Sequence, residues 1–126
     1  MDSNANNDNR IEAFHAYRSR MNARILEGEK AHLGIKRFFN LDSNAYREGA
    51  LDRRTKEMLG LVASLVLRCD DCILYHLVNC VDEGLKEEEI VEAMNVGLVV
   101  GGSIVIPHLR RAYEALDELL SQKHEG

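Results

Sequence analysis

Apolar residues recur at helical spacing along most of the chain, and no stretch shows the period-two alternation of a half-buried strand. Near the N-terminus they follow each other at steps of three and four residues: Phe14, Tyr17, Met21 and Ile25. The last part of the chain repeats this spacing at Leu109, Tyr113, Leu116 and Leu120. The pattern predicts an all-α protein, a compact bundle of about five to six helices.

Polar and turn-forming residues predict where the first helices begin and end. Residues 1–9 are polar and rich in asparagine, which predicts a disordered N-terminal tail. The helical pattern starts at Arg10, and Gly28 and Gly34 are expected to bend or split this long element. Asp42 or Ser43 can cap a short helical turn through Tyr46, which Gly49 would end.

The central part of the chain predicts a buried helix followed by three more. Asp52 is a suitable N-cap for a helix from Arg53 to about Arg68. From Met58 to Leu67 this helix is apolar on nearly every side, so we expect it to be buried at the centre of the bundle. Further helices are expected over residues 71–83, residues 87–100 and from about residue 107 to the end. One domain over residues 10–126 accommodates all of them.

Composition indicates which kinds of partner the protein is expected to bind and where in the cell it is expected to act. The chain has 126 residues, 45% of them hydrophobic, and a formal net charge of -5. Its basic residues are scattered, so we expect no nucleic-acid partner. The first ten residues lack the apolar stretch of a signal peptide, and the longest apolar runs, 61–67 and 96–106, are too short to span a bilayer. A cytoplasmic protein with no membrane association is expected.

The residues with the clearest chemical potential lie together at positions 69–76. Cys69 and Cys72 form a Cys-x-x-Cys motif, and in a cytoplasmic protein this spacing indicates redox chemistry or metal binding. Asp70 is expected to be the N-cap of the following helix, which places Cys72 in its first turn, where the helix dipole lowers a thiol pKa. His76 follows Cys72 by four residues, on the same helix face, and could accept a thiol proton.

Residues near this motif have other interpretations that do not involve redox chemistry. From periodicity alone, Glu57 is better explained as an exposed residue paired with Arg53, four residues earlier, than as an inward-facing partner of an imidazole. Cys80 could be a second resolving thiol, but a small buried hydrophobe is the favoured interpretation. The cysteines, His76 and Glu57 are residue types that can bind zinc. The sequence has no second pair of ligands at the usual spacing, however, so a zinc site is the less favoured interpretation. His108, after Pro107, is expected to be a surface residue at a helix end.

The spacing of Glu57, Cys69, Cys72 and His76 matches a known signature, Glu-x11-Cys-x-x-Cys-x3-His. On these residues the chain resembles the alkyl hydroperoxidase D-like proteins of the carboxymuconolactone decarboxylase superfamily. The resemblance covers roughly residues 45–118 and includes the run from Val99 to His108. It implies an all-helical fold that usually assembles as trimers or hexamers, so a homo-oligomer is expected.

The resemblance also implies roles for the four residues. Cys72 would attack a peroxide, Cys69 would resolve the sulfenic acid to a disulfide, and His76 with Glu57 would relay the proton. No cofactor is expected, only an external dithiol reductant, either a protein or a small molecule. In the peroxidase that defines the group, a histidine precedes the second cysteine. Here that residue is Asp71, whose charge raises the pKa of the Cys72 thiol.

The sequence therefore favours a thiol-dependent peroxidase or disulfide oxidoreductase with catalytic residues Cys72, Cys69, His76 and Glu57. The alternative that Asp71 favours is a non-enzymatic helical oligomer that senses redox state or binds a small ligand. A third possibility is acid/base chemistry of the decarboxylase type on Glu57 and His76, which would not need the cysteines.

Overall fold

The structure is a computed structural model in which the backbone is described for residues 3–125 and the side chains for residues 10–123. The described backbone forms six α-helices and one short 3-10 turn, with no strand. The predicted all-α class and helix number are thus confirmed. The chain divides into two compact units, Met1–Arg47 and Glu48–Gly126, and each is described by itself. A single domain over residues 10–126 stays a prediction.

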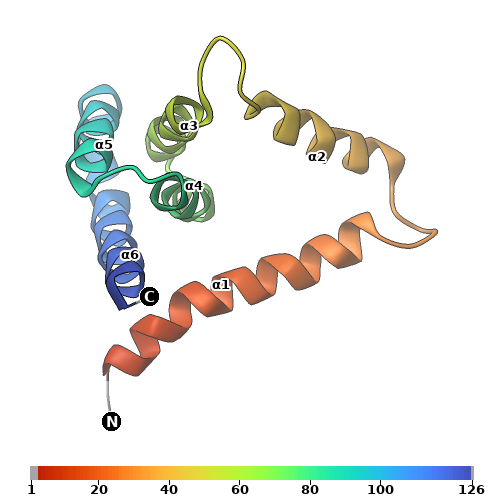
Figure 1. Ribbon diagram of the computed structural model, residues 1–126, viewed down its shortest axis with the longest axis horizontal. Helices are drawn as coiled ribbons and strands as arrows, with labels where there is room; N and C mark the ends of the chain where they lie inside the picture. The colour runs from red at the N-terminus through yellow and green to blue at the C-terminus, as the bar shows by residue number, and fades with distance from the viewer. Residues whose placement is uncertain (1–2, 126) are drawn as a thin grey trace. The chain divides into compact units, whose positions relative to one another are not determined.

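The first unit holds two helices, α1 (Ser3–Leu26) and α2 (Leu33–Ala45) (Figure 1). Helix α1 begins at Ser3, so the backbone is helical over most of residues 1–9, where a disordered tail was expected; Met1 and Asp2 lie outside the described residues. This stretch contains neither glycine nor proline to stop a helix that continues from Arg10.

The connection between α1 and α2 differs in part from the expected one. Gly28, with φ of +88°, lies in the break between the two helices, as predicted. Gly34 lies inside α2, and so do Asp42 and Ser43, so the separate short turn expected near Tyr46 does not exist. His32 is the N-cap of α2, because its Nδ1 accepts hydrogen bonds from the backbone N–H groups of Gly34 and Ile35 at 3.1 and 3.4 Å.

The second unit is a bundle of four helices. They are α3 (Arg53–Leu67), α4 (Asp70–Asp82), α5 (Glu87–Gly101) and α6 (Ile106–Glu125), with the 3-10 turn η1 (Ser103–Val105) between the last two. Helix α3 packs against both α4 and α5, and α4 also packs against α6 (Figure 1). None of the helices within residues 3–125 combines the length and the hydropathy that a membrane span requires.

The start of α3 is capped as predicted. Asp52 precedes the helix in an extended conformation, and its Oδ1 accepts a hydrogen bond of 2.8 Å from the backbone N–H of Thr55. Because hydrogen bonding to Thr55 stabilises the carboxylate, it holds the pKa of Asp52 below its usual value. The cap therefore fixes where α3 begins.

The expectation that α3 is the buried central helix holds for only one of its faces. Gly60, Leu61, Ser64 and Leu65 share its buried face, whereas Leu59 is 55% exposed and Leu67 is 75% exposed. The physical reason is that α4 and α5 cover only part of the helix circumference. Within residues 58–67 the one polar side chain, Ser64, lies on the buried face, so no polar residue marks the uncovered side.

The two faces of α3 give a test of this packing. Leu61→Ala is expected to lower the free energy of unfolding by about 2–5 kcal/mol, because it leaves a cavity beneath a fully buried side chain. Leu59→Ala, on the exposed face of the same helix, is expected to change it by no more than about 0.5 kcal/mol. Urea unfolding followed by circular dichroism measures both. Equal losses would contradict this arrangement of α3.

Candidate functional site

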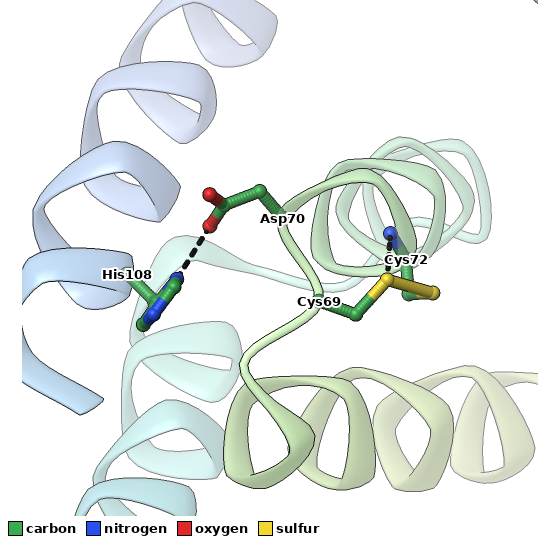
Figure 2. The surroundings of a disulfide bond; sticks show 4 residues. All are labelled: Cys69, Asp70, Cys72 and His108. Carbon is green, nitrogen blue, oxygen red and sulfur yellow. Dashed lines mark hydrogen bonds and ion pairs between the residues drawn. A yellow bond between two sulfur atoms is a disulfide. The ribbon is translucent and has the colours of Figure 1, made fainter. Parts of the chain in front are cut away.

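The candidate site begins at the junction between α3 and α4. Arg68 ends α3 in the left-handed conformation, with φ of 60°, and the chain turns directly into Cys69. Cys69, not Asp70, is the N-cap of α4: its Sγ accepts a hydrogen bond of 3.3 Å from the backbone N–H of Cys72 (Figure 2). The predicted cap was therefore wrong by one residue, and Asp70 is the first residue of the helix.

The two cysteines are joined as a disulfide in this structure (Figure 2). Their Cα atoms are 5.2 Å apart, within the usual range for bonded cysteines. Cys72 is exposed and Cys69 is partly buried. The positive end of the helix dipole and a backbone N–H group therefore lie beside the pair, an environment that favours a thiolate once the bond is reduced.

A buried acid–imidazole pair lies behind the cysteines. Glu57 of α3 and His76 of α4 are 1% and 7% exposed, and Oε1 of Glu57 lies 2.8 Å from Nδ1 of His76. Asn79, one turn before the end of α4, donates a second hydrogen bond of 3.2 Å to the same oxygen. Since an ionised carboxylate can only accept, Nδ1 then carries a proton, and proton uptake and release fall to Nε2.

The exposed interpretation of Glu57 is therefore wrong. Glu57 lies on the same face of α3 as Leu61 and Ser64, four and seven residues later, and this face is buried. Its expected partner Arg53 instead forms an ion pair of 3.1 Å with Glu83, near the end of α4. The structure thus brings Glu57 to His76, and it places His76 one turn along α4 from Cys72.

Gly60 is a residue of this site that sequence analysis missed. A Cβ atom built on Gly60 would lie 2.5 Å from Cε1 and 2.7 Å from Nε2 of His76, closer than real Cβ contacts allow. Only glycine at this position lets the imidazole lie against the backbone of α3, within reach of Glu57. The signal in the sequence is a glycine inside an otherwise strong helix, three residues after the glutamate.

The third cysteine, Cys80, is not part of the disulfide. Cys80 is fully buried and free. Burial, with a smaller contribution from the negative charges of Glu57 and Glu83, raises the pKa of the Cys80 thiol to about 12. A thiol in this state is a poor nucleophile near neutral pH, which confirms the interpretation of Cys80 as a small buried hydrophobe.

The first residue of α4 is held by α6. Oδ1 of Asp70 lies 2.8 Å from Nδ1 of His108 (Figure 2). Its Oδ2 accepts a hydrogen bond of 3.2 Å from Nη1 of Arg111. His108 therefore differs from the expected surface histidine: its side chain is 20% exposed and contacts the residue next to Cys69. Asp71, between the cysteines, is exposed.

Among the side chains of residues 10–123, no three from histidine, cysteine, aspartate and glutamate come together in a way that could hold a metal ion. The ligand set considered for zinc from the sequence is thus not assembled here. The bonded cysteine pair and the Glu57–His76 pair instead provide two sulfurs and a proton-transfer group, which suits thiol chemistry.

A substitution at Gly60 tests this geometry. Gly60→Ala is expected to push the His76 ring away from Glu57 and to lower the free energy of unfolding by about 1–3 kcal/mol through overpacking. Urea unfolding and the NMR signals of the His76 ring measure the two effects. Gly49→Ala is the matched control, because the nearest atom to its new Cβ is Nζ of Lys56, 4.0 Å away. Unchanged His76 signals in Gly60→Ala would contradict the close approach.

Comparison with known proteins places this site in a family. Residues 35–115 match the model of the carboxymuconolactone decarboxylase family. A solved structure of a member of that family from Thermotoga maritima, for which involvement in an antioxidative response has been suggested, shares 58% identity and a TM-score of 0.85. The match covers 90% of this chain and 95% of the other.

Two more distant relatives also match this chain. The "uncharacterized protein 4 in cox locus" of Paracoccus denitrificans is 32% identical over 82 residues, which are 65% of this chain and 74% of that protein. A structure of a carboxymuconolactone decarboxylase family protein from Legionella pneumophila, at 24% identity and a TM-score of 0.73, covers 89% of this chain and 96% of its own, and shows the same fold. The chain therefore belongs to the carboxymuconolactone decarboxylase family and carries a Cys-x-x-Cys pair at a helix start.

Proposed function

We propose that this protein is a thiol-dependent oxidoreductase that reduces hydroperoxides, or disulfides, with the Cys69–Cys72 pair. The observation that carries the proposal is the disulfide at the start of α4, one helical turn from the buried Glu57–His76 pair. A reactive thiol needs an environment that stabilises its anion and a group that manages its proton. Both lie at this helix start. The antioxidative response suggested for the Thermotoga maritima relative points to the same class of reaction.

In the peroxide reaction, the Cys72 thiolate attacks the terminal oxygen of a hydroperoxide. The O–O bond breaks, Cys72 becomes a sulfenic acid, and the alkoxide leaves as an alcohol after taking up one proton. The Cys69 thiol then attacks the sulfenic sulfur, the disulfide forms and water leaves. Cys72 has the nucleophilic role because it is the more exposed of the two cysteines.

An external dithiol completes the cycle. One of its thiolates attacks the disulfide to form a mixed disulfide, and its second thiol displaces the protein thiolate, so that two electrons and two protons return to the cysteines. The net reaction converts a hydroperoxide and a dithiol into an alcohol, water and a disulfide. No cofactor is needed beyond this reductant. The cytoplasm, where such donors are kept reduced, is the proposed location.

His76 and Glu57 act as the proton relay in this proposal. Nδ1 of His76 is held by Glu57, which fixes the orientation of the ring and supports positive charge on it. Nε2 then takes the thiol proton when the nucleophile forms and returns a proton to the leaving alkoxide. Asn79 stabilises the Glu57 carboxylate and so keeps this acceptor in place.

A second candidate function is a redox sensor that oxidises once and is not built for turnover. The observation that favours it is Asp71, an exposed carboxylate beside Cys72, which raises the pKa of that thiol and slows peroxide attack. Turnover separates the two candidates, because a sensor consumes about one equivalent of peroxide and an enzyme consumes many.

The proposed function is tested by peroxide consumption in the presence of a dithiol such as dihydrolipoamide. The wild type is expected to consume many equivalents, and Cys72→Ser is expected to consume none above the uncatalysed rate, because the nucleophile is missing. His76→Ala is expected to lower the rate by about 10²-fold or more through loss of proton transfer. Coupled peroxide assays measure all three proteins.

Cys80→Ser is the matched control for this experiment, because Cys80 is buried and outside the pair. It should retain the wild-type rate. A wild type that stops after one equivalent would leave the sensor as the better description. A wild type that consumes no peroxide, together with a decarboxylation activity that survives serine at both Cys69 and Cys72, would instead support decarboxylase-type chemistry on Glu57 and His76.

We also propose that the protein acts as a homo-oligomer. Helix α5 exposes Val96, Val99 and Val100, spaced by three and four residues on one side, and Ile104 of η1 follows; all four are more than half exposed. A contiguous apolar surface of this kind is typical of an interface, and closed symmetry is its usual form.

A charged substitution tests this apolar α5 face. The wild type is expected to run as a trimer or hexamer in light scattering after size exclusion, and Val99→Glu is expected to shift it to smaller species, because a carboxylate would have to be buried without a partner. Glu87→Lys, at an exposed position in the first turn of α5 and on the other side of the helix from these valines, should leave the mass unchanged. A wild type that is monomeric would contradict the proposal.

A further inference from the structure

The first turn of α4 places a carboxylate next to each cysteine of the pair. Asp70 follows Cys69, and Asp71 precedes Cys72. A negative charge a few ångströms from a thiol raises its pKa, because it destabilises the thiolate. Two such charges oppose the effect of the helix start described above. Both carboxylates are exposed, but the side chain of Asp70 also has two partners on α6.

Those partners hold the Asp70 carboxylate away from the sulfurs. Figure 2 shows that its side chain points toward His108, while the Sγ of Cys69 points to the other side of the helix start, toward Cys72. Nδ1 of His108 and Nη1 of Arg111 lie 2.8 and 3.2 Å from the two carboxylate oxygens. We refer to Asp70, His108 and Arg111 as the Asp70 clamp.

We propose that His108 is a positioning residue for the redox pair: through the Asp70 clamp it holds one negative charge away from Cys69 and so favours the reduced, thiolate-bearing state. This inference rests on the proposed function, since it concerns the same two cysteines. His108 does not touch the sulfurs and takes no part in bond making. It acts through Asp70 alone.

The effect follows from the chemistry of the disulfide. Reduction by a dithiol breaks the S–S bond with two electrons and leaves a thiol and a thiolate at the helix start, whereas the disulfide carries no charge there. Any charge that stabilises the thiolate therefore stabilises the reduced protein and makes the pair more oxidising. Other charged groups at this end of α4 are Arg68 and Asp71, both exposed, and the buried Glu57–His76 pair.

Two opposite substitutions separate charge from mere structural support. His108→Ala leaves Asp70 with one partner fewer, so its charge can turn toward Cys69; the thiol pKa should rise and the equilibrium should move toward the disulfide by roughly fivefold. Asp70→Asn removes the charge, so the thiol pKa should fall and the equilibrium should move toward the dithiol by a similar factor. Both substitutions break the same contact.

The experiment equilibrates the full-length protein with glutathione buffers of known ratio and counts free thiols after acid quenching. Thiol pKa values come from the pH dependence of alkylation of the reduced protein. His108→Ala, Asp70→Asn, the double variant and the wild type form a double-mutant cycle. In the Asp70→Asn background, His108→Ala is expected to have no further effect. Arg110→Ala is the control, since it removes a positive charge from an exposed position on the same helix.

Each outcome decides the inference. Shifts of His108→Ala and Asp70→Asn in the same direction would mean that the contact only supports the helix start, and the inference would be overturned. An unchanged equilibrium in His108→Ala, or an effect that persists fully in the Asp70→Asn background, would also overturn it. If wild type formed no disulfide under oxidising buffers, the proposed function would fail as well. If the wild type forms and reduces its disulfide normally and His108→Ala has no effect, this inference alone would be overturned and the proposed function would stand.

Discussion

The hydrogen bond between Glu57 and His76 is the interaction on which the site depends. A buried carboxylate without a partner would destabilise the fold, because removing its hydrogen bonds leaves a desolvation cost of about 1–3 kcal/mol or more. His76 and Asn79 supply those bonds from α4, so the two helices are held in one register. The absence of a side chain at Gly60 makes the short approach possible. Fold stability and the geometry of the proposed proton relay thus rest on the same few atoms.

Much of this fold could be predicted from the sequence, because helix periodicity and caps are local properties. Asp52 was found as a cap, and the helices after residue 52 lie within about two residues of the expected bounds. Errors came where local rules compete. Asp70 ranks above cysteine as an N-cap, yet the chain leaves α3 through Arg68 and places Cys69 at that position. His32 caps α2 although histidine is not a typical cap.

The site was predictable in its members but not in its arrangement. The spacing of Glu57, Cys69, Cys72 and His76 identified the residues, whereas periodicity alone favoured an exposed Glu57, since long apolar runs give no sign of which side faces a neighbour. Contacts between residues far apart in the sequence could not be predicted from local patterns. Gly60 against His76 and Asp70 against His108 depend on how α3, α4 and α6 pack, and no local pattern encodes that distance.

The cap of α4 has one more consequence, because the atom that accepts its hydrogen bond is the sulfur of Cys69. The charge on this sulfur changes in the proposed reaction. An anionic acceptor forms a stronger hydrogen bond to an amide than a neutral one. The bond from Cys72 N–H to Sγ of Cys69 is therefore expected to be stronger in any step of the proposed reaction in which Cys69 is a thiolate than in the disulfide. In the proposed reaction, one sulfur atom would thus both change its charge and hold the first turn of α4.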